Sequence, residues 1–173
     1  DKGLWKDIPA FALPKEGNED VLLPEKFRLL ELDVEQMKSI LAQAIKASHR
    51  GTQGVKVVLD LPMPDGTFER FGIESAQVMH PELAVKFPDI HSFAGVGLDN
   101  PAAKIYFDFN SFGFHAMILT AGKTAFFIEP VSRGDVEHYR CYEYSNSDWE
   151  KMETECAKLT GLDVHDKNQS GHA

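Results

Sequence analysis

The sequence lacks several features that would place the chain in a functional class at once. It has two cysteines in 173 residues, Cys141 and Cys156, which is too few for a fold built on disulfides. Its 18 lysines and arginines stand against 27 aspartates and glutamates, and the net charge of −9 argues against binding to nucleic acid or to an anionic membrane. No apolar run approaches the ~20 residues needed to cross a bilayer.

Sequence motifs for common catalytic chemistry are also missing. There is no HExxH pair for zinc and no GxSxG turn for a serine nucleophile. Gly95-Val-Gly97 lacks the third glycine of a dinucleotide-binding loop, and Arg133-Gly-Asp135 is interpreted as an ordinary loop. His115, inside a predicted strand, is interpreted as a half-buried, hydrogen-bonded histidine. The sequence therefore shows no catalytic constellation, and we expect the chain to have no cofactor of its own. A hydrolase in its own right would require a clustered acid–base pair, which the sequence does not show.

What the chain does contain is a series of strand-like segments separated by turn sequences. Pro64-Asp-Gly66 and Ala121-Gly-Lys123 are turn sequences at the spacing of hairpins. Alternation of apolar and polar residues, clearest around Phe107, indicates strands with one buried face. The predicted strands are residues 55–61, 68–73, 90–97, 104–110, 114–119, 124–128 and 138–144.

Two longer helices are predicted, one before these strands in the sequence and one after them. Asp33 is placed to cap the first helix, whose apolar residues recur at three- and four-residue spacing up to Ile45. Ser147-Asp-Trp-Glu150 is a capping box, and the helix that it starts carries Cys156 on its apolar stripe. We predict an α+β fold in which a hairpin-built antiparallel sheet, an open barrel or half-sandwich, packs against both helices.

The composition divides the chain into three parts. Residues 1–31 contain three prolines and show no lasting period, and we interpret them as an arm that docks through anchors such as Trp5. Residues 32–160 hold the predicted strands and helices and form one α+β domain. Residues 161–173 are polar and contain glycine, which is typical of a tail or a linker.

Three interpretations of the two cysteines remain open. A Cys141–Cys156 disulfide would tie the last strand to the helix that follows, in an oxidising compartment. Both could instead be buried free thiols. A thiolate could also reach a zinc ion in another domain and block its open catalytic position. The place of Cys156 on an apolar stripe counts against the third interpretation, which needs an accessible sulfur.

The order of segments in the middle of the chain resembles a protein family. The succession LDLPMPDGTFERFGIES, MHPELAVKFP, IHSFAGVGLDNP and GFHAMI, closing with FFIEP, is similar to the N-terminal pro-region of secreted bacterial zinc metalloproteases of the reprolysin-like (metzincin) kind. The resemblance covers residues 32–144. In that family an HExxH catalytic domain follows the pro-region, and a cysteine often follows the last strand, where Cys156 falls. Cys141 departs from the usual pattern.

The resemblance implies a non-catalytic pro-domain that is a folding template and a latency inhibitor of the protease cleft. Its partner would be the cognate metalloprotease catalytic domain, which carries the zinc, and its location would be secreted, periplasmic or extracellular. Cys156 is then the candidate zinc-blocking thiolate, whereas a Cys141–Cys156 bridge would remove that thiol. The alternative hypothesis is a free-standing extracellular module that binds a protein or a glycan through the same sheet.

Overall fold

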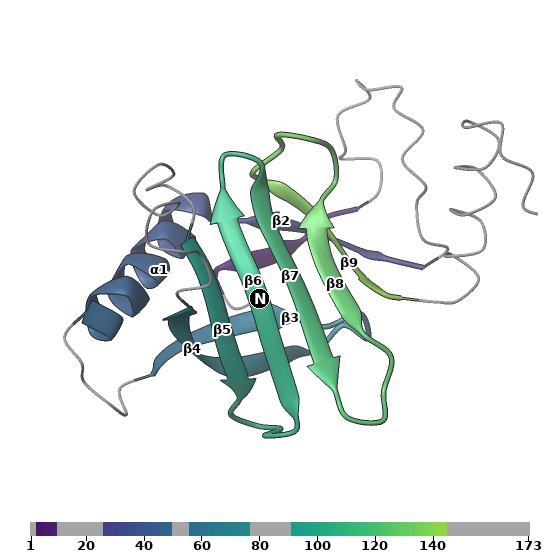
Figure 1. The fold of residues 1–173 in the computed structure, drawn as a ribbon. Helices are drawn as coiled ribbons and strands as arrows, with labels where there is room; N and C mark the ends of the chain where they lie inside the picture. Colours follow the sequence, from purple (N-terminus) through teal and green to yellow (C-terminus); the bar gives the residue numbers. More distant parts are fainter. Residues whose placement is uncertain (1–2, 10–25, 50–55, 77–90, 145–173) are drawn as a thin grey trace, which may run out of the picture.

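The chain folds as an antiparallel sheet of nine strands that curls into a nearly closed barrel, with one helix beside it (Figure 1). The computed structural model describes residues 3–9, 26–49, 56–76 and 91–144. A membrane-spanning helix is absent from these ranges. The elements are β1 (Trp5–Asp7), β2 (Arg28–Leu32), α1 (Val34–His49), β3 (Val57–Pro62), β4 (Phe68–Ala76), β5 (His91–Gly97), β6 (Ala103–Asn110), β7 (Gly113–Thr120), β8 (Phe126–Pro130) and β9 (His138–Glu143).

The order of the strands explains the barrel. Strands β3 to β9 each pair with the next strand in the sequence, and β9 then pairs with β2 and β2 with β1. The sheet therefore ends in β1 on one side and β3 on the other. These two edges face each other across a seam. The Nε1–H of Trp5 on β1 donates a 3.1 Å hydrogen bond across this seam to the carbonyl oxygen of Asp60 on β3.

The predicted α+β class with two packed helices is wrong. Strands make up 54% of the described residues, and α1 is the one helix among them, so the fold is a mainly β barrel. The error has a physical cause: β1 and β2 have three and five residues, too few to show a period, yet they extend the sheet and bring its edges together. The second predicted helix, beginning at Ser147, lies outside the described residues.

The remaining predictions of local structure are confirmed where the structure describes them. The seven predicted strands are β3 to β9, with small differences at their ends. The predicted first helix is α1, and Asp33 caps it, because its Oδ1 accepts a 2.9 Å hydrogen bond from the backbone N–H of Gln36.

The apolar face of α1 closes one side of the core. Met37, Leu41 and Ala44 are buried there, and the helix lies against β3 and β4. Ser48 ties the end of the helix to β4, because its hydroxyl oxygen accepts a 3.2 Å hydrogen bond from the N–H of Ser75. The first predicted helix therefore packs against the sheet, as expected.

Candidate functional site

The inside of the barrel is filled by packed side chains. The Phe107 ring lies 5.0 Å from that of Phe93 and 5.2 Å from that of Phe114, measured between ring centroids. The Trp5 ring packs edge-on at 5.5 Å against Phe114 and at 5.4 Å against Tyr139. All five side chains are buried, and Trp5, on strand β1, is a packing anchor, as predicted. The interior is therefore core, which leaves the seam and the outer surface for functional groups.

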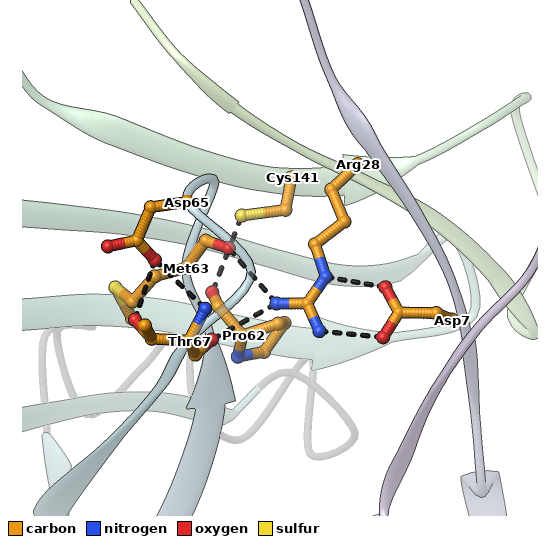
Figure 2. A network of polar contacts seen from close by, with 7 residues as sticks. All are labelled: Asp7, Arg28, Pro62, Met63, Asp65, Thr67 and Cys141. Atoms are coloured by element: carbon orange, nitrogen blue, oxygen red, sulfur yellow. Dashed lines mark hydrogen bonds and ion pairs between the residues drawn. The ribbon is translucent and has the colours of Figure 1, made fainter. Parts of the chain in front are cut away.

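The seam between the two sheet edges is bridged by Arg28 of β2 (Figure 2). Its Nη1 donates 3.0 Å hydrogen bonds to the carbonyl oxygens of Met63 and Thr67, at the two ends of the β3–β4 turn. Its Nε and Nη2 bind the carboxylate of Asp7 on β1, at 2.5 and 2.8 Å. The guanidinium carbon also lies 4.7 Å from the ring centroid of Phe68. One cation thus joins three segments, which is a structural role.

Cys141 lies beside this network on β9, as Figure 2 shows. Its side chain is fully buried, and its thiol donates a 3.4 Å hydrogen bond to the carbonyl oxygen of Pro62. Burial raises the pKa of the Cys141 thiol to about 12, more than the nearby Arg28 cation lowers it. The group is therefore a neutral thiol at physiological pH, which is a poor nucleophile and a poor metal ligand.

The second sequence-predicted site residue, Cys156, lies outside the described residues. Cys141 is a free thiol in the structure. The zinc-blocking role of Cys156 and its disulfide with Cys141 both remain predictions.

A polar cluster on the outside of β6 and β7 surrounds His115. Its Nδ1 lies 3.7 Å from Oδ2 of Asp108, which also accepts a 2.7 Å hydrogen bond from the amide of Asn110. Partial burial raises the pKa of Asp108, against the opposing effect of His115. His115 is half-buried, as predicted, but its 3.7 Å contact with Asp108 is longer than the predicted hydrogen bond. No group of three or more His, Cys, Asp or Glu side chains suited to a metal is found in the part of the chain that the structure describes.

The Arg133-Gly-Asp135 tripeptide lies in the loop between β8 and β9, so its interpretation as a loop is confirmed. The Asp135 carboxylate accepts hydrogen bonds from the backbone N–H groups of Glu137 and His138, at 2.9 and 3.0 Å, and its side chain is 13% exposed. It also lies 3.1 Å from Nδ1 of His138. Because these contacts occupy the carboxylate, it organises the loop rather than presenting itself to a partner.

Apolar side chains form a continuous row on the outside of β5 to β9. The register places Tyr106 beside Met117, Met117 beside Phe127 and Phe127 beside Tyr142, with Ala94 at the β5 end. Leu119 lies two residues beyond Met117 on β7, and is 39% exposed, while Tyr106 is 47% exposed. We call these six residues the outer face. Along β6 and β7, residues of the outer face alternate with the core residues Ile105, Phe107 and Ile118.

Sequence reasoning did not find the outer face or Arg28. The strand alternation around Tyr106 and Met117 was visible, but an alternating strand does not reveal which of its two sides is the core when both carry apolar residues. Arg28 lies in a segment without a recognisable period, and its partners are 35 and 39 residues away. Only the curling of the sheet into a nearly closed barrel brings β2 and the β3–β4 turn together.

Comparisons with known proteins leave the family open. The chain matches no protein-family model, no curated protein and no solved structure.

Proposed function

We propose that this chain is the non-catalytic pro-domain of a secreted zinc metalloprotease, acting as a folding template and as an inhibitor of the protease cleft. The observation that carries the proposal is the ordered resemblance to reprolysin-like pro-regions. Its quoted segments, where described, fall on strands in the order of the sheet: LDLP on β3, FERFGIES on β4, HSFAGVG on β5, GFHAMI on β7 and FFIEP on β8. The resemblance therefore follows one continuous meander.

The filled barrel supports a role in binding rather than in catalysis. Buried aromatic rings occupy the interior, so a partner is met by the outer surface. Side chains also join the sheet edges across the seam, which gives a rigid body to bind. A rigid binding surface loses little conformational entropy when a partner docks on it.

Covalent attachment explains how such a domain keeps a protease latent. While both domains share one chain, the linker holds the inhibitor at a high effective concentration beside the cleft. Cleavage of the linker removes this advantage and lets the pro-domain dissociate. The same surface, presented while the protease folds, would act as a template.

The test is inhibition in trans. The open reading frame that encodes this chain is extended by sequencing, and the HExxH domain expected downstream is produced separately. Residues 1–173 should inhibit cleavage of a fluorogenic peptide by that domain at a near-stoichiometric ratio, and should leave an unrelated zinc protease active. A reading frame without a zinc-protease domain overturns the proposal, and so does full activity at a large molar excess of the chain.

Cys156 is the proposed zinc-blocking residue, and a matched pair of variants tests it. In the uncleaved precursor, Cys156→Ser should raise proteolytic activity because a serine hydroxyl is a far weaker zinc ligand than a thiolate. Cys141→Ser is the control, since its thiol is buried against Pro62 and does not reach a partner. Equal latency of the Cys156→Ser precursor and the unmodified precursor would show that latency comes from the docked surface alone.

A further inference from the structure

The aromatic side chains of the outer face are held in place by contacts with their neighbours. The rings of Phe127 and Tyr142 stack with centroids 5.8 Å apart and planes inclined by 23°, and the Tyr144 ring lies 5.7 Å from Phe127. The Tyr142 hydroxyl donates a 2.9 Å hydrogen bond to Glu129, which holds the ring in place. Tyrosine, phenylalanine and methionine are the residue types enriched in the cores of protein interfaces. The outer face therefore has both the composition and the rigidity of a docking surface.

Charged groups border the outer face. Lys104 lies beside Leu119 in the β6–β7 register. On the other border, Asp108 lies beside His115, and Arg140 lies 3.5 Å from Glu129. The apolar row is thus framed by a polar rim, the usual anatomy of a protein–protein interface.

We propose that the outer face is the surface on which the catalytic domain of the same precursor docks, an inference that rests on the proposed function. The occupant is a folded domain with an apolar patch that covers Tyr106, Met117 and Phe127. The interface contact is made by the outer-face side chains of β6 to β9, and the seam contacts of Trp5 on β1 and Arg28 on β2 take no part in it.

The course of the chain supports this occupant. The described chain leaves the barrel at Tyr144, whose N–H donates a 2.9 Å hydrogen bond to Ala125 and whose ring packs on Phe127. Whatever follows in the sequence therefore starts at the border of the outer face. Residues 145–173 span at most ~100 Å when extended at ~3.5 Å per residue, so a domain joined after them easily reaches this face.

Charge and chemistry favour this occupant over two others. A second copy of the chain would bring another net charge of −9 to the interface, and the two copies would repel each other. A glycan needs several converging polar groups. The outer face offers the exposed Tyr106 hydroxyl, whereas the Tyr142 hydroxyl is bound to Glu129.

Three variants that introduce the same charge at exposed apolar strand positions test the proposal. Tyr106→Glu and Leu119→Glu change the outer face, while Val58→Glu, at a residue 48% exposed on β3, is the matched control. Inhibition of the separate catalytic domain is measured for each, with thermal unfolding as a check of folding. We expect the inhibition constant to rise at least ~10-fold for the two outer-face variants, and to stay within about twofold for Val58→Glu.

The outcomes separate this proposal from the proposed function. If the unmodified chain inhibits and all three variants inhibit equally well, the docking surface is wrong while the pro-domain function stands. If the unmodified chain does not inhibit at all, both fail. Sedimentation of the unmodified chain as a dimer that Tyr106→Glu dissociates would assign the outer face to a second copy. Retardation by a polysaccharide in affinity electrophoresis, lost in Tyr106→Glu, would assign it to a glycan.

Discussion

The indole N–H of Trp5 and the carbonyl oxygen of Asp60, 3.1 Å apart, join the first strand of the barrel to the opposite edge of its sheet. Arg28 and Cys141 make similar contacts further along the same edge, to Met63 and Pro62. The seam is therefore joined by side chains that bind backbone carbonyls. Pro62 has no N–H to offer, which makes this edge unsuited to pairing with another strand.

Replacement of Arg28 should destabilise the barrel. Arg28→Lys keeps the charge but loses the planar fork that binds Asp7 and both carbonyl oxygens of the β3–β4 turn. The free energy of unfolding should fall by about 1–3 kcal/mol, since the part-buried carbonyl group of Met63 and the carbonyl group of Thr67 lose their donor. Denaturation with urea, followed by tryptophan fluorescence, measures the change.

Arg70→Lys is the control for that measurement. Arg70 also binds a carboxylate through two nitrogens, with Nε and Nη2 at 3.0 and 2.6 Å from the oxygens of Asp99, but both side chains are about half exposed. Water screens this pair, so its loss should matter much less than the loss of the Arg28 contacts. Equal destabilisation by the two substitutions would contradict the role given to Arg28.

The Asp7–Arg28 pair predicts how acid affects stability. The hydrogen bond from Arg28 holds the pKa of the Asp7 carboxyl below its usual range. A carboxyl with a lowered folded pKa stabilises the protein above its unfolded pKa of about 3.9, and this stability is lost as the pH falls through the folded value. Asp7→Asn should therefore reduce stability at pH 7 and flatten the loss of stability below about pH 4.

The size of the Asp7 effect is limited by solvent. The Asp7 side chain is 61% exposed, so the decrease at pH 7 should be less than about 1 kcal/mol. On an Arg28→Met background the Asp7→Asn substitution should change little. Urea denaturation of the four proteins at several pH values completes the cycle, and an unchanged effect of Asp7→Asn without Arg28 would refute the coupling.

Cys141 should be unreactive until the barrel unfolds. Its burial raises the pKa of the thiol to about 12, so almost no thiolate is present at pH 8. In a Cys156→Ser variant, Ellman's reagent should therefore detect no thiol in the native protein and one in urea. Unmodified chain unfolded without reductant should yield two thiols, because Cys141 is free in the structure. A yield of zero would establish the Cys141–Cys156 disulfide instead.

Alanine substitutions at two glycines with positive φ distinguish the cost of backbone strain from the cost of steric crowding. Gly113 has φ 108° and Gly122 has φ 74°, so alanine is strained at both positions, by about 1–2 kcal/mol. A Cβ at Gly113 would lie 2.7 Å from Cγ of Pro130, whereas nothing lies within 4 Å at Gly122. Gly113→Ala should therefore lose about 1–3 kcal/mol more than Gly122→Ala in thermal or urea unfolding. Equal losses of stability would show that the start of β7 adjusts to an added Cβ at Gly113 without cost from the contact with Pro130 on β8.

Much of the fold was predictable from short stretches of sequence. The strands from β3 to β9 and the capped helix α1 depend on alternation, turn residues and helical spacing, which act between neighbours in the chain. The mainly β class was not predictable, because it depends on β1 and β2. Their pairing with β9 and the contact of Trp5 with Asp60 join residues far apart in the sequence.

The same division holds for the candidate site. The sequence by itself determined the number of cysteines, the net charge, the missing catalytic motifs and the strand alternation on which the outer face depends. Only the tertiary structure decided that Cys141 is buried and that, on β7, Met117 points outward while Ile118 fills the core. The physical reason is that burial is a property of the closed barrel: a side chain loses contact with water only when strands from distant parts of the chain surround it.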